Sequence, residues 1–134
     1  MPSDKRVLLV DDDPDIREAI RDTLADEGYE TIEARDGQEA LDYLRSHPVP
    51  PLVLLDWNMT PVNGPQFMAE AAKDPALSKV PVVLLTADAR ALEQSKAGFV
   101  GCLTKPVSLD ALFEVVARYC GPLRGNRRTE QQGR

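Results

Sequence analysis

The sequence predicts an α/β fold: a doubly wound sheet of five parallel strands with helices on both faces. Short apolar runs such as VLLV at residues 7–10 alternate along the chain with longer amphipathic segments. Runs of this kind are typical of strands that are buried on both faces, as in parallel sheets covered by helices. Strict alternation of strand and helix favours right-handed crossover units and hence the doubly wound topology. A length of 134 residues fits one domain of this kind.

The five expected strands are short and mostly apolar. They span residues 7–10, 29–34, 52–55, 80–85 and 99–104. The second alternates polar and apolar residues, which predicts less complete burial. Pro81 is acceptable because it stands near the start of the fourth run, where one missing N–H is tolerated.

Five helices are expected between and after these strands, each with a recognisable start or stop. Asp13 is the predicted N-cap of the first helix, Pro14 its first residue and Gly28 its end. Asp36 and Glu39 form a capping-box pattern before the second. The remaining signals are a start near Gly64, a short helix at 89–96, a Ser108 cap and a stop at Gly121 and Pro122.

The charge distribution excludes several classes of partner and location. The net charge is −6, made of 12 basic and 21 acidic residues up to residue 120 (a balance of −9) and +3 in the last 14 residues. An acidic body disfavours direct binding to nucleic acid or to anionic membranes. No apolar run approaches the length of a membrane span, and no signal peptide is evident. Cys102 and Cys120 are expected to be reduced thiols, so a cytoplasmic protein is predicted.

Polar residues stand where four of the expected strands end. Asp11 and Asp12 follow the first, Asp56 the third, Thr86 the fourth and Lys105 the fifth. Each alone is an ordinary loop residue, but the carboxyl ends of parallel strands meet at one edge, where ligands of this fold class bind. We therefore expect these five side chains to form one site.

Three carboxylates and a single lysine predict a cation site. Two like charges about 4 Å apart repel by roughly 4 kcal/mol at an effective dielectric constant near 20. All-oxygen ligation favours Mg²⁺, which is usually shared with phosphate oxygens. Lys105 and the Thr86 hydroxyl suit a phosphoryl group, and Asp56 is the predicted nucleophile.

Other chemistries lack their residues. Neither a GxGxxG motif after the first strand nor a GxxxxGK[ST] motif is present, so dinucleotide and nucleoside triphosphate sites are not predicted. The only histidine, His47, stands in a loop after the second helix, which argues against a Ser-His-Asp site. Zinc has no cluster of ligands.

Four segments together resemble the receiver domain of two-component response regulators. They are VLLVDDDPDIR, LLDWNMTPVNG, VVLLTADA and LTKPV, and the resemblance covers residues 5–120. It implies the flavodoxin-like strand order 2-1-3-4-5. The stretch DWNM is similar to single-domain chemotaxis regulators of the CheY type. Residues 121–134 are expected to form a basic, disordered tail.

The resemblance also implies a role for each site residue. Asp56 would be the phosphoacceptor, with Lys105 and Thr86 contacting the phosphoryl group. The Mg²⁺ ligands would be Asp11, Asp12, Asp56 and the backbone carbonyl of Asn58. Asn58 and Asp88 would occupy the two positions that tune the lifetime of the phosphoryl group.

Some positions depart from the family pattern. Thr60 stands where a proline is usual, with Pro61 one place later. Cys102 replaces the usual aromatic residue and Val107 the usual phenylalanine, and the segment from Thr86 to Lys105 is about three residues short, close to one helical turn. We expect the phosphorylation chemistry to be intact but the coupling between Thr86 and an aromatic residue to be altered, with the helix at 89–96 responding instead.

The predicted function is a phosphorylation switch. A histidine kinase or histidine phosphotransfer protein would donate a phosphoryl group to Asp56, and the surface formed by the fourth helix, fifth strand and last helix would change its affinity for an unknown downstream protein. Such a domain catalyses its own phosphorylation and dephosphorylation but is not a turnover enzyme. Two alternatives remain: a Mg²⁺-dependent phosphohydrolase of haloacid dehalogenase type, and a receiver-fold scaffold independent of phosphorylation.

Overall fold

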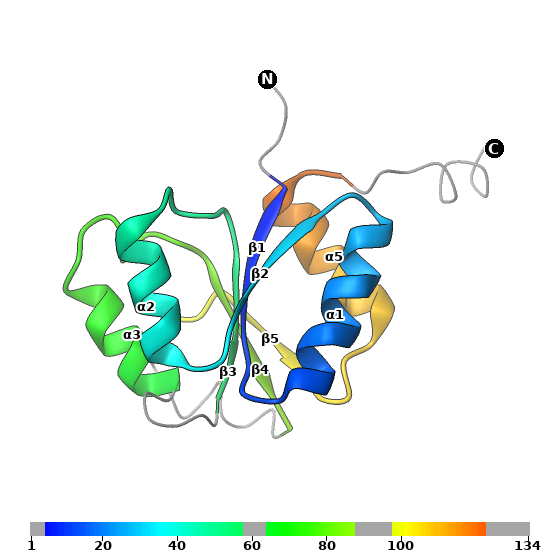
Figure 1. Ribbon diagram of the computed structural model, residues 1–134, viewed down its shortest axis with the longest axis horizontal. Coiled ribbons are helices and arrows are strands. Elements are labelled where there is room, and N and C mark those ends of the chain that lie inside the picture. The colour runs from blue at the N-terminus through cyan, green and yellow to red at the C-terminus, as the bar shows by residue number, and fades with distance from the viewer. Residues whose placement is uncertain (1–4, 58–63, 88–97, 123–134) are drawn as a thin grey trace.

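The protein is described by a computed structural model that covers residues 5–57, 64–87 and 98–122. A central sheet lies between two pairs of helices (Figure 1). The strands are β1 (Arg6–Val10), β2 (Glu30–Ala34), β3 (Val53–Asp56), β4 (Val82–Thr86) and β5 (Gly101–Thr104). The described helices are α1 (Pro14–Asp26), α2 (Gly37–Ser46), α3 (Gly64–Ala72) and α5 (Leu109–Cys120). The helix expected at 89–96 lies outside the described residues.

All strand pairs are parallel, and the order across the sheet is β2-β1-β3-β4-β5. This confirms the predicted fold class and strand order. Four strands begin later than predicted: β2 and β3 by one residue, at Glu30 and Val53, β4 by two, after Pro81, and β5 by two, at Gly101. Proline has no N–H to donate to a neighbouring strand, so the ladder begins beyond it.

The predicted caps are present at three helix starts. The Asp13 carboxylate accepts from the N–H groups of Asp15 and Ile16 at the start of α1. The Ser108 hydroxyl accepts from Ala111 at the start of α5. Each cap satisfies backbone donors that have no partner within the helix, an effect worth about 1 kcal/mol.

The capping box at α2 differs in detail from the prediction. Asp36 accepts from the N–H of Glu39, as expected. Glu39, however, reaches back one residue further, to the N–H of Arg35 at 2.7 Å, and also pairs with the Arg35 side chain. The ion pair with Arg35 draws the glutamate away from the N–H of the cap residue.

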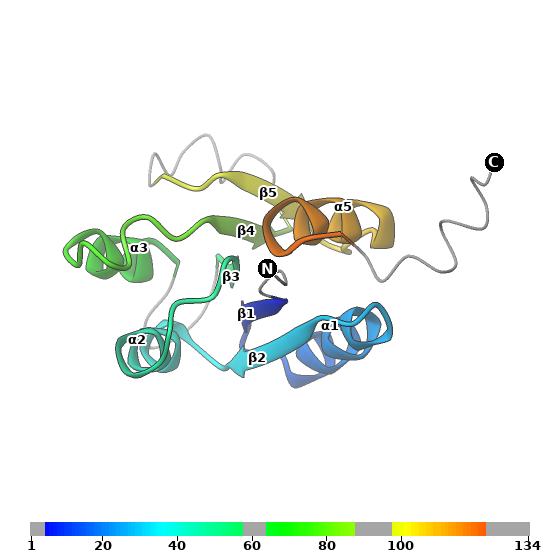
Figure 2. The same cartoon turned by 90° about the horizontal axis from the view of Figure 1, so that it is seen from above.

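Two apolar cores lie on opposite faces of the sheet (Figure 2). Successive residues of β1 point to opposite faces, so Val7 and Leu9 join the core under α1 and α5, whereas Leu8 and Val10 join the core under α2 and α3. All four are completely buried. Full burial of one such side chain is worth roughly 1.5–3 kcal/mol, which explains why β1 is apolar from Val7 to Val10.

The parallel register brings the carboxyl ends of the strands to one edge of the sheet, the lower edge in Figure 1. Val10 pairs with Leu55, Asp56 with Leu85, and Thr86 with Thr104. The residues that follow these strands therefore meet at that edge. No helix in the described ranges is long and apolar enough to span a bilayer.

Candidate functional site

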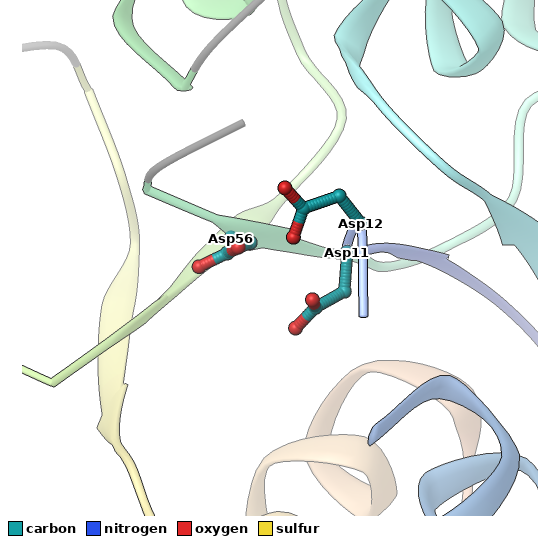
Figure 3. A group of neighbouring side chains, drawn as sticks. All are labelled: Asp11, Asp12 and Asp56. Atoms are coloured by element: carbon teal, nitrogen blue, oxygen red, sulfur yellow. The ribbon is translucent and has the colours of Figure 1, made fainter. Parts of the chain in front are cut away.

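Three aspartates converge at the carboxyl edge of the sheet (Figure 3). Asp11 directly follows β1, Asp12 is the next residue, and Asp56 is the last residue of β3. One carboxylate oxygen from each lies within 4.8 Å of the other two. Asp11 is fully buried and Asp56 is 6% exposed, whereas Asp12 is exposed to solvent. The prediction that these carboxylates lie together is confirmed.

Lys105 supplies the positive charge of the group. Its Nζ donates to Asp11 Oδ2 at 3.0 Å and to Asp56 Oδ1 at 3.2 Å. Its backbone N–H donates to the Thr86 carbonyl at 2.7 Å, which holds the residue beyond the end of β5 beside β4. One ammonium group thus bridges carboxylates that come from β1 and β3.

Within the described residues the charges of the site do not balance, since three carboxylates lie beside one ammonium group, which contacts Asp11 and Asp56. Burial raises the pKa of the Asp56 carboxyl, and the neighbouring charge of Asp11 raises it further, although Lys105 acts in the opposite direction. Burial acts to lower the pKa of Lys105, but its hydrogen bond to Asp11 and the charge of Asp56 outweigh it, so that pKa is also raised. The Asp56 shift thus comes first from burial and then from the Asp11 charge, whereas the Lys105 shift comes from the two carboxylates that it contacts.

This group of side chains fits a hard divalent cation. Carboxylate oxygens are the ligands that Mg²⁺ prefers, and the described part of the cluster contains neither imidazole nor thiolate. A cation would offset the repulsion that keeps the Asp56 pKa high. Asp12 is the most accessible of the three carboxylates, because Asp11 already accepts from Lys105 and, at 2.9 Å, from the N–H of Asp13.

Thr86 is the last residue of β4 and is 3% exposed. It follows Leu85, which pairs with Asp56 across the ladder, so the threonine lies one position further toward the same edge. Asn58, Asp88, Thr60 and Pro61 lie outside the described residues, as does the tail from residue 123. Their expected roles stay predictions.

Two of the positions that depart from the family pattern, Cys102 and Val107, lie on and after β5. Cys102 is partly buried within the strand, and burial raises the pKa of its thiol. Val107 packs against the core under α1 and α5. An aromatic contact that the sequence did not predict lies nearby: the ring of Trp57, the residue after Asp56, is tilted against Phe99 with 6.2 Å between centroids.

Sequence reasoning also missed Arg17. Its guanidinium donates to the backbone carbonyl of Asp11 at 2.7 Å, and it pairs with Glu33 of β2 at 3.1 Å. A signal was present, because a cation in the first turns of a helix opposes the helix dipole and so calls for a specific partner. The pattern of the sequence does not identify that partner.

Comparison with known proteins places this geometry in a family. Residues 7–117 match the model of the response regulator receiver domain. The polar-differentiation response regulator DivK of Brucella anthropi is 33% identical over an alignment of 120 positions, which covers 87% of this chain and 97% of DivK.

Solved structures agree in fold. The chemotaxis protein CheY4 of Vibrio cholerae superposes with a TM-score of 0.76 at 30% identity, covering 85% of this chain and 97% of CheY4. The response regulator TrrA of Thermotoga maritima, solved in complex with Mg²⁺ and BeF, gives a TM-score of 0.76 at 34% identity, covering 86% of this chain and 98% of TrrA. With its strand order, its acidic edge and these relatives in agreement, the chain belongs to the response regulator receiver domains of two-component signalling.

Proposed function

We propose that this chain is a phosphoacceptor switch in which Asp56 receives a phosphoryl group. The observation that carries the proposal is the placement of Asp56 at the end of β3, 6% exposed, with the carboxylates of Asp11 and Asp12 within 4.8 Å and Lys105 Nζ at 3.2 Å. A carboxylate beside a cation site and a fixed ammonium group has the surroundings that phosphoryl transfer requires.

The donor is a phosphohistidine of a histidine kinase or a histidine phosphotransfer protein. In the transfer the P–N bond to the imidazole breaks and a P–O bond to an Asp56 carboxylate oxygen forms, so the imidazole leaves with the electron pair of the P–N bond. Lys105 and the Thr86 hydroxyl contact phosphoryl oxygens, which offsets the charge that moves onto Asp56. Hydrolysis of the acyl phosphate by water resets the switch.

Mg²⁺ is the proposed cofactor, held by Asp11, Asp12, Asp56 and the backbone carbonyl of Asn58. When bound, the ion supplies charge neutralisation for the phosphoryl oxygens. The proposed lifetime positions are Asn58 and Asp88. The chain has two free cysteines, one of them buried, which fits the reducing cytoplasm as its compartment.

An apolar groove beside the site is the proposed contact for the protein donor. The groove has a volume of about 250 Å³ and lies between α1 and the segment that follows β5. Ile16, Ala19 and Leu109 line it, and so does Lys105, which also contacts Asp56. A donor that rests in this groove brings its phosphohistidine next to the acceptor carboxylate.

The test is adduct formation with a small phosphoryl donor. The chain is incubated with MgCl₂ and acetyl phosphate, and intact-mass spectrometry is expected to show one phosphoryl group per molecule. Asp56→Asn and chelation by EDTA should each abolish the adduct, whereas Asp13→Asn, which alters only the helix cap, should retain it. Multiple turnover of phosphomonoesters would favour a phosphohydrolase, and no adduct in the wild type would favour a scaffold.

A further inference from the structure

Arg17 joins the acidic edge to the neighbouring β2 strand. Its Nη1 donates to the Asp11 backbone carbonyl at 2.7 Å, and its Nε donates to Glu33 Oε1 at 3.1 Å. The side chain is only 13% exposed, so both contacts are largely shielded from water. A guanidinium presents several donors in one plane, which suits it to hold two acceptors at once.

The carbonyl that Arg17 binds belongs to the peptide group that joins Asp11 to Asp12. Rotation of that planar group about the Cα–C bond of Asp11 would move the Cα of Asp12 and redirect its side chain. The N–H of Asp11 is held separately, because it donates to the Ala34 carbonyl at 3.1 Å. Asp11 is thus held at both backbone groups: its N–H by Ala34 of β2 and its carbonyl by Arg17.

Arg21 provides an internal comparison one turn further along α1. It also binds Glu33, with Nη1 at 2.8 Å from Oε2, and it contacts Asp22 at 3.3 Å. Its side chain is 42% exposed, and these contacts are with carboxylates at the surface. Arg17 and Arg21 therefore share Glu33 but differ in their contact with the Asp11 carbonyl.

We infer that Arg17 is a positioning residue for the proposed cation site: it fixes the Asp11–Asp12 peptide so that both carboxylates face Asp56. This inference rests on the proposed function. The inference concerns the geometry that Arg17 imposes and not its charge. The loss of that geometry and the loss of that charge have opposite expected effects on Mg²⁺ affinity. A nearby positive charge repels Mg²⁺, so on charge alone the loss of Arg17 would tighten Mg²⁺ binding. Loss of the anchored peptide would weaken it, as is typical for partners that orient metal ligands.

Mg²⁺ affinity separates these predictions. MgCl₂ is titrated into the full chain while the emission of Trp57, the only tryptophan and the residue after Asp56, is followed. Arg17→Lys keeps the charge but cannot hold both acceptors in the same plane, and Arg17→Met removes the charge as well. Both are expected to raise the Mg²⁺ dissociation constant roughly tenfold. Arg21→Met, the matched control, is expected to leave it within about twofold.

Amide hydrogen exchange supplies a second readout that does not require the ion. The N–H of Asp13 donates to Asp11 Oδ1 at 2.9 Å and reports on the geometry of the loop. Its exchange is expected to be faster in Arg17→Lys than in Arg21→Met. If Arg17→Met fails to fold, Arg17→Lys carries the test.

Three results would overturn the inference. Arg17→Lys could bind Mg²⁺ as tightly as the wild type, Arg17→Met could bind it more tightly, or Arg21→Met could weaken binding as much as the Arg17 variants. In all three the wild type still binds Mg²⁺ and forms its phosphoryl adduct, so the proposed function survives. A wild type that shows neither overturns the proposed function, and this inference with it.

Discussion

At the amino edge of the sheet, the side chains of Tyr29 and Lys5 donate to backbone carbonyls, whereas at the carboxyl edge a group of three carboxylates has one ammonium group among the described residues, in contact with two of them. At the amino edge the Tyr29 hydroxyl donates to the Gly121 carbonyl at 2.7 Å. Lys5 donates to the Pro122 carbonyl, and its Nζ lies 5.1 Å from the centre of the Tyr29 ring. Burial raises the pKa of Tyr29 to about 12, so its phenol stays neutral.

The difference separates the amino edge, which contributes to stability, from the carboxyl edge, where we propose that Mg²⁺ and the phosphoryl group bind. The amino edge holds the segment after α5 beside the start of β2 through two donors, the neutral Tyr29 phenol and the Lys5 ammonium, each bonded to a backbone carbonyl. Among the described residues, the carboxyl edge keeps an excess of negative charge that a bound cation would offset, and this excess costs stability. Changes at the two edges should therefore separate stability from binding.

The largest effect is expected from Lys105→Met. The change leaves Asp11 and Asp56 buried without their shared cation, which should cost about 3 kcal/mol of unfolding free energy at pH 7. Added MgCl₂ and mild acidification should each restore part of this loss. Urea unfolding with and without MgCl₂ measures it, and Lys79→Met, at an exposed lysine, is the control. Equal stability of the two variants would contradict the account.

Asp56→Asn should change stability in the opposite direction. It removes one of the crowded carboxylates, so the unfolding free energy without metal should rise by roughly 1–2 kcal/mol at pH 7. MgCl₂ should stabilise the wild type but hardly affect the variant. A variant less stable than the wild type in EDTA would show that burial and the charge of Asp11 together do not outweigh the contact of Asp56 with Lys105.

The pH dependence follows from the same carboxyl. Because the folded-state pKa of Asp56 is raised, the folded protein binds this proton more tightly than the unfolded chain does. Its contribution to stability is fully present below the unfolded pKa, near 3.9, and is lost as the pH rises through the folded pKa. The stability advantage of Asp56→Asn should therefore grow from about pH 4 upward, which thermal unfolding across pH in EDTA can follow. A constant difference would contradict the raised pKa.

Tyr29→Phe tests the amino edge. It removes the hydrogen bond to Gly121 and leaves a carbonyl without this donor, which should cost about 1 kcal/mol. The Mg²⁺ dissociation constant and the yield of phosphoryl adduct should stay at the wild-type values. Urea unfolding and the Trp57 titration report the two quantities on the same sample. A change in Mg²⁺ affinity would show that the edges are coupled.

Ala19→Asp, at an exposed position in the groove, is expected to have the smallest effect on the stability of the folded protein. A carboxylate there should slow transfer from a phosphorylated histidine kinase roughly tenfold, because about 1.4 kcal/mol of docking energy would be lost. The reaction with acetyl phosphate should be unchanged. The kinase is chosen by its transfer to the wild-type chain. Equal slowing with both donors would place the effect on the acceptor chemistry.

Much of this arrangement could be predicted from the sequence. Apolar runs identified four of the five strands, and polar–apolar alternation identified the one at residues 29–34. The rule that ligands bind at the carboxyl ends of parallel strands brought Asp11, Asp56 and Lys105 to one edge. These predictions succeed because they depend on burial and on chain direction, which a local pattern encodes. Strand starts were less accurate, because Pro81 and the residues before Gly101 are apolar without joining the ladder.

Contacts between distant side chains could not be predicted. Arg17 lies 16 residues before Glu33, and only the pairing of β1 with β2 brings the two together. The contact between Trp57 and Phe99 likewise depends on how the chain enters β5. Such pairs follow no periodic pattern in the sequence. The partner of a long side chain can therefore be identified only once the fold is known.

The short link between β1 and α1 has an evolutionary consequence. Only residues 11–13 separate the two elements, and each has its own contact: Asp11 with Lys105, Asp12 in the carboxylate group, and Asp13 as the helix cap. An insertion or deletion there would shift the register of one contact against the others. The link between α3 and β4, residues 73–81, is longer, and its side-chain hydrogen bonds are local: Asp74 Oδ1 accepts from the N–H of Ala76, and the Ser78 hydroxyl donates to the Pro75 carbonyl. Length variation among descendants of this chain should therefore accumulate in the second link and be purged from the first.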